Sequence, residues 1–454
     1  MKQHPANLIS QRSTQEAFKV FEVFAVMVVG ATSFFYLVSI LWPGSLSISY
    51  HIVVSFLLFQ AALSYWYTLS VFNPKRFVAL PSAEHKEIPR TTFIVTAYLP
   101  NEIAVIEESL MNILQNIERP QDGVEVILAY NTPHMEPLEL ALRDLALRWP
   151  QLILANAYNS RSKSENLNYA INIASGKMIA LLDADHLVAP DCLRRAWRWL
   201  DEGYDVVQGR CRVRNIHDSF VSRLVGVEFE IIYGIQHPSK SIIFDTSLFG
   251  GSNGYWKSTA LKSVRFLESM LTEDIDSTLR GVLSGCRFVH DRSIVSSELA
   301  PVTWSGFWAQ RKRWAQGWFQ CSVRYQGRIW ATRYLNLRQK FIWTTLLSWR
   351  VLYDIVGSLL FPILFAFWLY RGTVAFPMNH YIAFALVFTL FSGPLQAIAA
   401  CKNASRPRAP LTHYLFYFIF VWPYTIYKII IHLVAIRDEL TGERIWVVSK
   451  RKAR

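Results

Sequence analysis

Two aspartates one residue apart, Asp183 and Asp185, follow the apolar segment at residues 178–183. Side chains alternate along an extended segment, so the two carboxylates are expected to point the same way. Such a pair at the end of a strand can hold Mg²⁺ or Mn²⁺, with substrate phosphates as further ligands. The alternative is a solvated turn that contains two acids. The apolar strand before the pair favours a metal site on Asp183 and Asp185.

A second acidic motif is Thr272-Glu273-Asp274, whose Glu273 and Asp274 are the candidate catalytic residues. A carboxylate beside a bound metal–diphosphate could take the proton from an acceptor hydroxyl. General-base help of this kind is worth roughly 10²- to 10⁴-fold in rate. The alternative is that these acids begin a helix and complement its dipole.

The most unusual window, residues 301–340, holds eight Lys or Arg, five Trp and no acid. Gln310, Arg313 and Trp314 share a face if this segment is helical, because they are spaced i, i+3 and i+4. A guanidinium there can bind a diphosphate bidentately, and an indole can stack on a sugar ring. The alternative is an amphipathic helix on an anionic membrane surface. Nucleic acid would suit the same composition, but the neighbouring apolar segments argue against it.

A fourth motif, FGGSNG at residues 249–254, packs three glycines into six residues. Such a loop lets the backbone approach a ligand closely. An ordinary turn is an equally good interpretation of this segment.

These motifs need elements that position them. Four runs are rich in β-forming residues and two have the helical spacing of apolar residues: 92–98, 124–130, 152–157 and 178–183 for strands, and 104–117 and 167–174 for helices. Strands that alternate with helices predict an α/β domain with a parallel sheet covered on both faces. Ligands bind such sheets beyond the carboxyl ends of the strands, where the acidic motifs lie.

The composition points to a membrane protein with a folded domain. The chain has 454 residues, of which 52% are hydrophobic and 18% charged, and a net charge of +13. Its mean hydropathy is +0.19. Disorder, collagen and a disulfide scaffold are excluded by this composition. The five cysteines are scattered, which predicts reduced thiols that face the cytosol.

Several apolar blocks are long enough to cross a bilayer, which takes about twenty residues as a helix. They are residues 23–42, 52–72, 341–370, 372–400 and 411–436. Basic residues flank the first pair, which places both flanks in the cytoplasm. The basic loop at 401–410 and the basic tail are each expected inside, and both placements cannot hold if the fifth block spans once. The alternatives to a single span are a block that bends at Pro423 and returns and one that lies in the interface. The first block is too long for a signal peptide and lacks a cleavage site.

In this order, D-x-D at 183–185, T-E-D at 272–274 and Q-x-x-R-W at 310–314 resemble the membrane-embedded branch of family 2 glycosyltransferases. That branch includes cellulose, chitin and hyaluronan synthases, nodulation-type chitooligosaccharide synthases and some glucosyltransferases that act on lipids. The resemblance covers residues 90–325. It implies a Rossmann-like GT-A domain that uses a nucleotide sugar, usually a UDP-sugar, with Mg²⁺ or Mn²⁺ and inverts α to β.

The resemblance also implies residue roles. Asp183 would lie near the nucleotide, Asp185 on the metal, and Asp274 would be the general base. Gln310 and Arg313 resemble the lid over the diphosphate. Trp314, Gly251, Ser252 and Asn253 resemble residues that contact the acceptor. Lys163 and Asn168 resemble a stretch near the donor.

The chain departs from the family pattern in the segments that are expected near the nucleotide base. The family usually shows P-x-Y-N-E after the first strand, whereas here Leu-Pro separates Tyr98 from Asn101 and Glu102. These three residues are expected to contact the donor. The second strand usually ends in an Asp that meets the uracil, and here Asn131 stands in that region. An amide can both donate to and accept from a base edge.

The expected organisation is an N-terminal segment with two transmembrane helices, a cytoplasmic GT-A domain, interfacial helices, C-terminal transmembrane helices and a basic cytoplasmic tail. The boundaries are 1–75, 76–300, 301–350, 351–436 and 437–454. The location expected is a bacterial inner membrane, with multiple passes.

Three functions remain open at this stage. The first is a synthase that extends a β-linked polysaccharide from a nucleotide sugar and passes the chain through its own helices. The second is a transferase that adds one sugar to a lipid such as diacylglycerol, a sphingolipid or a polyprenyl acceptor. A membrane scaffold without activity is the third, and it would not need two acidic motifs and a diphosphate clamp. The partners implied are a nucleotide-sugar donor, a glycan or lipid acceptor and the bilayer, without nucleic acid.

Overall fold

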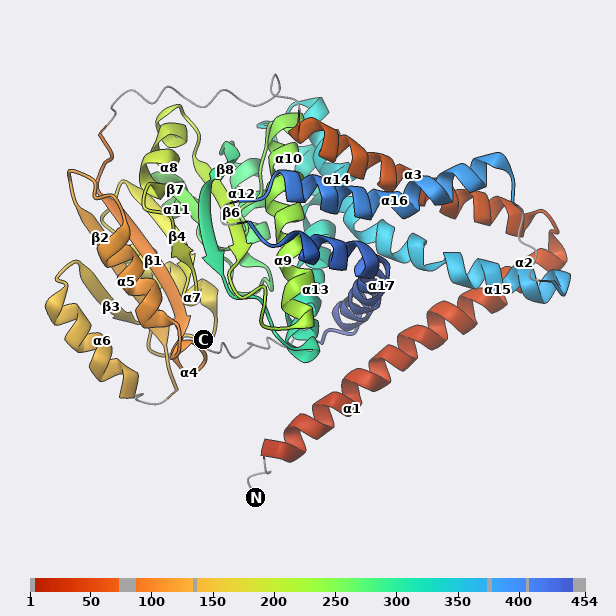
Figure 1. Cartoon of the computed structure of the whole chain (residues 1–454), viewed down its shortest axis with the longest axis horizontal. Helices are drawn as coiled ribbons and strands as arrows, with labels where there is room; N and C mark the ends of the chain where they lie inside the picture. Colours follow the sequence, from red (N-terminus) through yellow and green to blue (C-terminus); the bar gives the residue numbers. More distant parts are fainter. Residues whose placement is uncertain (1–4, 73–86, 134–136, 374–377, 406–407, 444–454) are drawn as a thin grey trace.

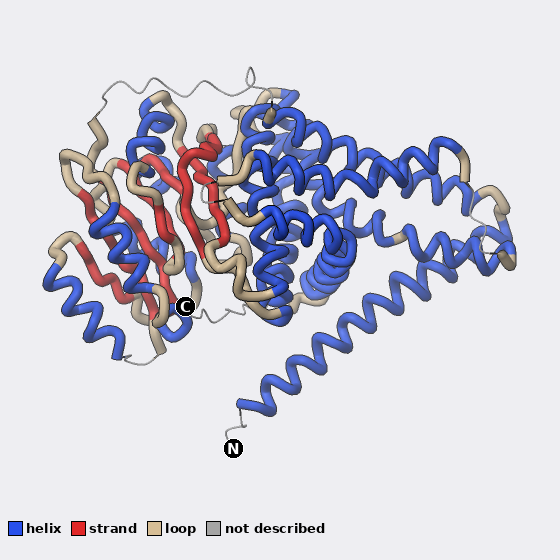
Figure 2. The backbone as a smooth tube through the Cα atoms, in the orientation of Figure 1, coloured by secondary structure: helices blue, strands red, loops and turns tan. Residues whose placement is uncertain are grey.

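The computed structural model describes residues 5–72, 87–133, 137–373, 378–405 and 408–443, and only the backbone of residues 5–13. Within these ranges the chain forms an α/β domain, residues 87–300, and a set of long apolar helices that extend to one side of it (Figures 1 and 2). The predicted basic tail beyond residue 443 and the predicted domain boundary at residue 76 lie outside the described residues.

The α/β domain is built on an eight-stranded sheet in the order β3-β2-β1-β4-β7-β6-β8-β5. The strands are β1 (Thr91–Tyr98), β2 (Val124–Asn131), β3 (Leu152–Asn156), β4 (Met178–Asp183), β5 (Leu187–Val188), β6 (Val206–Val213), β7 (Gly254–Lys257) and β8 (Phe288–Glu298). Strands β1 to β4 are mutually parallel, as the sequence predicted, and β6 and β8 run in the same direction. The sheet is mixed because β7 and β5 run the other way.

The reversed direction of β7 decides where the glycine-rich loop lies. β7 pairs antiparallel with both β4 and β6, so its first residue, Gly254, pairs with Leu181 near the carboxyl end of β4. The loop at residues 249–253 therefore reaches the same edge of the sheet as the acidic motif after β4. A parallel strand in this place would have put the loop at the opposite edge.

Helices cover both faces of the sheet, because each strand sends alternate apolar side chains to opposite sides. One face packs against α5 (Ile106–Asn116), α6 (Pro137–Arg148) and α8 (Cys192–Asp201). The other packs against α7 (Lys163–Ile173), α11 (Ser258–Val264), α12 (Glu273–Leu283) and α13 (Trp304–Ala331). The helices α4 (Leu99–Glu102), α9 (Phe220–Ile231) and α10 (His237–Phe244) complete the domain, with a π-helix, Ile232–Gln236, between the last two.

Five helical stretches are long and apolar enough to cross a membrane, by length and composition: Thr14–Leu41, Ser45–Val71, Leu337–Arg371, His380–Lys402 and Leu411–Leu440. They correspond to α1 (Pro5–Phe24) with α2 (Ala31–Leu41), α3 (Ser45–Val71), α14 (Leu337–Ser358) with α15 (Leu360–Arg371), α16 (His380–Lys402) and α17 (Leu411–Leu440). They fit a multi-pass membrane protein. The predicted boundary between residues 350 and 351 falls inside α14.

Both ends of α17 lie against the α/β domain and α13. Near its start, the His413 ring is 4.7 Å from the ring of His217. At its end, Glu439 accepts hydrogen bonds from Gln316 and Gln320 of α13, at 3.0 and 2.7 Å. Helix α17 runs from Leu411 to Leu440 without a break, so the chain does not turn back at Pro423, which was one of the two alternatives for this block.

Helix α13 approaches the start of α12 very closely. A Cβ added at Gly317 would lie 2.4 Å from the hydroxyl oxygen of Thr272, the residue that precedes α12. Farther along α13, a Cβ added at Gly327 would meet no heavy atom of the described residues within 4 Å, its own turn of helix apart. Glycine at 317 thus allows α13 to rest on the second acidic motif.

This close approach makes a stability prediction. Gly317→Ala should lower the melting temperature, because overpacking of a tight contact costs roughly 1–3 kcal/mol. Gly327→Ala, on the same helix, should leave it unchanged or raise it, since alanine favours a helix interior over glycine by about 1 kcal/mol. Thermal unfolding in detergent, followed by circular dichroism, measures both. Equal melting temperatures in the two variants would contradict tight packing at Gly317.

Candidate active site

Four segments that are distant in sequence meet at the carboxyl edge of the sheet, around the ammonium of Lys163. This Nζ is 2.5 Å from Asp183 Oδ1 and 3.4 Å from Glu273 Oε1, and it donates to the carbonyl oxygen of Gly251 at 2.9 Å. The structure thus joins the first residue of α7, the end of β4, the first turn of α12 and the glycine-rich loop. All four were singled out in the sequence.

The local sequence explains why Lys163 begins a helix here. Ser162 is the N-cap of α7, and its side chain accepts a hydrogen bond from the backbone N–H of Glu165. The cap places Lys163 at the first helical position, beside the end of β4. Burial opposes the charged form, but the carboxylates of Asp183 and Glu273 outweigh it and raise the pKa of Lys163 above its usual value. Lys163 is therefore a fixed cation.

The two aspartates of the first motif are held differently. β4 ends at Asp183, and Ala184 and Asp185 form a turn, so alternation along a strand is not what positions the pair, contrary to the sequence prediction. Asp185 is only 1% exposed, and its Oδ2 accepts the backbone N–H of Leu299 at 2.9 Å. Asp183 is about a third exposed in its side chain. Carboxylate oxygens are ligands that Mg²⁺ and Mn²⁺ accept, so the chemistry of this donor set fits such a cation, which would compete with Lys163 for Asp183.

Asp274 lies in the first turn of α12 beside the glycine-rich loop. A Cβ added at Gly251 would be 3.1 Å from Asp274 Oδ2, and Gly251 has a φ of +86°. Burial and the neighbouring Glu273 raise the pKa of Asp274 to about 7, against the opposite effects of Lys163 and Arg313. A carboxyl with this pKa can exchange a proton near neutral pH, as a general base requires.

The glycine-rich loop is fixed by a residue that the sequence did not indicate. Gln208 on β6 accepts the N–H of Gly250 at 2.7 Å and donates to the carbonyl oxygen of Ser252 at 3.0 Å. Ser252 in turn accepts the backbone N–H of Asp183 at 3.0 Å through its hydroxyl. The side chain of Asn253 is fully buried and bonds the backbone carbonyls of Arg210 and Ile294, both at 3.1 Å. Ser252 and Asn253 therefore hold the loop in its conformation through their side chains.

Helix α13 brings the third motif to the same place. Arg313 Nη1 donates to the carbonyl oxygen of Leu271, just before the second acidic motif, at 3.1 Å. Gln310 Oε1 is buried and has no hydrogen-bond partner among the described residues. Trp314 is partly buried, and the guanidinium carbon of Arg311 lies 4.3 Å from its ring centroid. Arg313 is thus beside the carboxylates, and Trp314 lies on the same helix one residue farther on.

The residues expected to contact the nucleotide base lie at the ends of β1 and β2. Tyr98 and Asn131 are register partners there, and the inserted Leu-Pro starts the short helix α4, which contains Asn101 and Glu102. The Asn131 amide donates to the carbonyl oxygen of Ser160 at 3.0 Å and accepts from Asn166 at 2.8 Å. These bonds use one of the two amide hydrogens and one of the two lone pairs of the amide oxygen.

Asn168 is likewise used by the protein, because it exchanges two hydrogen bonds with the backbone of Phe266. Its amide donates to the carbonyl oxygen at 2.8 Å, and its oxygen accepts the N–H at 3.1 Å. This pair ties α7 to the segment before α12. Asn168 therefore supports the position of Lys163 on the same helix.

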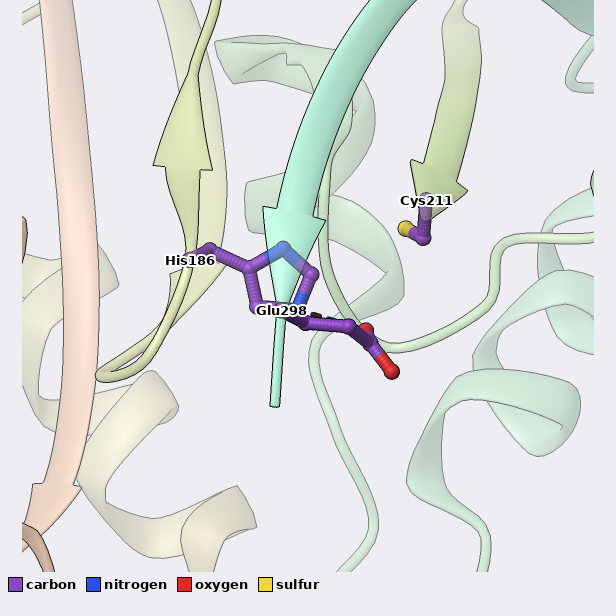
Figure 3. A group of neighbouring side chains, drawn as sticks. All are labelled: His186, Cys211 and Glu298. Atoms are coloured by element: carbon purple, nitrogen blue, oxygen red, sulfur yellow. Dashed lines mark ion pairs between the residues drawn. The ribbon is translucent and has the colours of Figure 1, made fainter. Parts of the chain in front are cut away.

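A second polar group lies behind Asp185, where His186, Cys211 and Glu298 have their potential ligand atoms within 4.8 Å of one another (Figure 3). His186 Nε2 is 2.9 Å from Glu298 Oε2, and its Nδ1 is 3.1 Å from the hydroxyl of Ser296. A metal ion would have to displace these bonds and deprotonate Cys211, whose pKa burial raises. We interpret the group as a hydrogen-bonded network that fixes the turn after Asp185.

Comparisons with known families cover most of the α/β domain and the helices after it. The profile described as "Glycosyl transferase family group 2" matches residues 178–431, and the one described as "Glycosyl transferase family 2" matches residues 92–255. Among solved structures, a mannosyltransferase, PcManGT from Pyrobaculum calidifontis in complex with GDP-Man and Mn²⁺, has 20% identity and a TM-score of 0.56. That match covers 88% of this chain and 100% of the mannosyltransferase, and it supports the GT-A fold.

Curated relatives include two named poly-beta-1,6-N-acetyl-D-glucosamine synthase. The one from Staphylococcus epidermidis is 24% identical over 295 residues, which is 62% of this chain and 68% of the relative. The one from Staphylococcus aureus strain COL is 27% identical over 248 residues, or 54% of this chain and 58% of the relative. The matched part of the S. aureus protein is therefore less than two thirds of its length.

The raised pKa of Asp274 predicts an acidic limb in the pH profile. An activity that needs the Asp274 carboxylate should have a kcat/KM that rises with pH and levels off above about 7, because the carboxyl is protonated at lower pH. In Glu273→Gln the limb should move to lower pH, since the neighbouring negative charge is gone. The measurement is kcat/KM between pH 5 and 9. A limb that stays in place in this variant would show that Glu273 does not set the pKa of Asp274.

Proposed function

This chain belongs to glycosyl transferase family group 2, and we propose that it transfers a sugar from a nucleotide sugar to a growing β-linked polysaccharide at a membrane. The observation that carries the proposal is the meeting of Lys163, Asp183, Glu273 and Asp274 at the sheet edge, directly under the helix that bears Arg313. This arrangement joins two carboxylate motifs with cations that suit a diphosphate.

The donor would bind at the carboxyl ends of β1, β2 and β4, with its base near Tyr98 and Asn131. A UDP-sugar is the donor we favour from the resemblance of the motifs. Asp185 and Asp183 would hold Mg²⁺ or Mn²⁺, which when bound neutralises charge on the diphosphate. Arg313 would close over the diphosphate from α13. Gln310, whose buried oxygen has no hydrogen-bond partner in the described part of the chain, lies one turn before it on that helix.

Asp274 would act on the acceptor. Its carboxylate takes the proton from the acceptor hydroxyl as that oxygen attacks the anomeric carbon of the donor sugar. The bond from this carbon to the diphosphate oxygen breaks on the opposite side, and the nucleoside diphosphate leaves. Attack opposite the leaving group inverts an α-linked donor into a β-linked product. Trp314 would support the acceptor sugar by stacking on its face.

The acceptor we propose is a glycan of N-acetylglucosamine type. Two relatives that match 62% and 54% of this chain are named as synthases of poly-β-1,6-N-acetyl-D-glucosamine. The five apolar stretches would hold the enzyme in the bilayer. Basic residues on both sides of the first two stretches favour a cytoplasmic location for the α/β domain. Nucleotide sugars are available in that compartment.

The product decides between a polymer and a glycolipid. Purified protein in lipid would receive a panel of radiolabelled UDP-sugars, UDP-N-acetylglucosamine among them, with Mg²⁺ or Mn²⁺. We expect label in a polymer that a β-1,6-N-acetylglucosamine-specific glycanase digests. Label confined to an organic-extractable lipid that carries one sugar would replace the proposed acceptor by a lipid.

Asp274→Asn separates donor binding from transfer. The amide keeps the shape of the side chain but cannot accept the proton, so transfer should fall by roughly 10²- to 10⁴-fold. Donor affinity, measured by calorimetry, should remain, because Asp274 is assigned to the acceptor. Near-normal turnover in this variant would falsify the general-base role.

Arg313→Ala should affect both donor binding and rate. Its proposed partner, the diphosphate, is charged in the ground state and in the transition state alike. Charge-assisted bonds to such a partner are worth about 1.5–3 kcal/mol each, so donor affinity should fall by one order of magnitude or more. The same calorimetry and transfer assay measure it. Unchanged donor affinity would remove Arg313 from the diphosphate site.

A further inference from the structure

Glu228 on α9 is buried where three helices meet. Its Oε2 is 2.5 Å from Arg311 Nη2 of α13 and accepts the hydroxyl of Tyr424 of α17 at 2.7 Å. Its Oε1 accepts from Lys428 Nζ of α17 at 2.7 Å. Both carboxylate oxygens are thus engaged by neighbouring helices, and the residue is 7% exposed.

These contacts keep Glu228 ionised. Burial alone would raise its pKa, but Arg311 and Lys428 outweigh burial and lower the pKa to about 2. A buried carboxylate that loses such partners is left as an uncompensated charge, so Arg311 and Lys428 must keep their positions beside it. Glu228 is therefore a fixed anion that binds α13 and α17 together.

Arg311 passes this constraint on to Trp314. Its guanidinium carbon lies 4.3 Å from the Trp314 ring centroid and 5.1 Å from that of Phe307. Trp314 is three residues after Arg311 and so lies on the same side of the helix, one turn on. Arg311 is 4% exposed, and its Nε has no hydrogen-bond partner among the described residues. The orientation of the Arg311 guanidinium is thus set by the ion pair with Glu228 and by the rings of Trp314 and Phe307 that pack on its face.

We propose that Glu228 is a positioning residue that holds the Trp314 ring in place through Arg311 and couples it to α17. The proposal rests on the proposed function, in which Trp314 supports the acceptor sugar. Glu228 touches neither substrate; it fixes the guanidinium against which the indole packs. A displacement of α17 at Tyr424 or Lys428 would change the position of Glu228 and with it the acceptor site.

The same helix supplies a matched control. Glu230 is 8% exposed and pairs with Arg210 Nη2, and it accepts the hydroxyl of Ser405 at 3.1 Å. Two residues along a helix turn the side chain by about 200°, so Glu230 faces the segment after α16 and not α13. Glu228→Gln and Glu230→Gln remove the same charge at similar burial from the same helix.

The experiment compares the two variants in lipid nanodiscs, with UDP-N-acetylglucosamine as donor and a β-1,6-linked glucosamine-type oligosaccharide as acceptor. Glu228→Gln should raise the acceptor KM by about tenfold, within the range of coupled neighbours, and leave donor affinity as in the wild type. Glu230→Gln should leave the acceptor KM within about twofold. Equal changes in both variants, or no change in Glu228→Gln, would overturn the proposal.

A double-mutant cycle shows whether the effect passes through Trp314. In a Trp314→Phe background, Glu228→Gln should change the acceptor KM by less than about twofold, because a contact that is already lost cannot be lost again. An undiminished effect in that background overturns the route through Trp314. If Glu228→Gln does not fold, Tyr424→Phe removes one hydrogen bond from the same carboxylate and should raise the acceptor KM by a smaller factor. No rise in that variant counts against the proposal.

Hydrogen exchange separates this inference from the proposed function. Amide exchange in residues 307–318 should be faster in Glu228→Gln than in Glu230→Gln, since only the first loosens α13 from α9 and α17. If the wild type transfers no sugar from any nucleotide sugar, the proposed function fails, and this difference still decides the positioning role. Equal exchange in the two variants would rule out the positioning role of Glu228.

Discussion

The ammonium of Lys163 is the interaction on which the candidate site depends. Asp183 and Glu273 both lie within ion-pair distance of it, and Asp274 is the next residue along α12. Three carboxyl groups brought to one edge of a sheet would repel one another, and like charges at this range raise pKa values or force the groups apart. Lys163 offsets that repulsion between Asp183 and Glu273. Asp274 keeps a raised pKa because its burial and the neighbouring Glu273 outweigh the opposite effect of Lys163. The N-cap Ser162 sets where α7 starts and so where Lys163 lies.

Backbone topology brings the other parts of the site to this edge. The antiparallel β7 places the glycine-rich loop beside the end of β4, and Gln208 and Ser252 fix that loop against Asp183. Gly251 then approaches Asp274 so closely that a side chain on it would meet the carboxylate. The backbone of the loop therefore lies directly beside the Asp274 carboxylate and leaves little space there. This geometry suits the exclusion of water from a reacting hydroxyl.

A second layer of buried charge joins the α/β domain to the apolar helices. Glu228 connects α9 with α13 and α17, and Arg210 connects with Glu230 and the segment after α16. Lys312 adds ion pairs to Glu16 of α1 and Asp438 of α17, at 2.6 and 3.0 Å. Helix α13 takes part in three of these contacts, through Arg311 and Lys312, and it also rests on the second acidic motif through Gly317. The helix that bears Arg313 is therefore joined by ion pairs to α1, α9 and α17.

The sequence by itself predicted part of the fold and the type of chemistry, because these properties are local. Apolar periodicity indicated β1 to β4, α5 and α7 but not β5 to β8, and the types of residue at 183–185, 272–274 and 310–314 predicted acid–base and diphosphate chemistry. Tertiary structure alone decided which atoms meet. It set the direction of β7, the turn that displaces Asp185 from the strand, the use of Asn131 and Asn253 in backbone hydrogen bonds, and the roles of Gln208 and Glu228. An isolated glutamine or glutamate among apolar residues carries no signal of its partner, since its hydrogen bonds and its ionisation depend on groups many residues away.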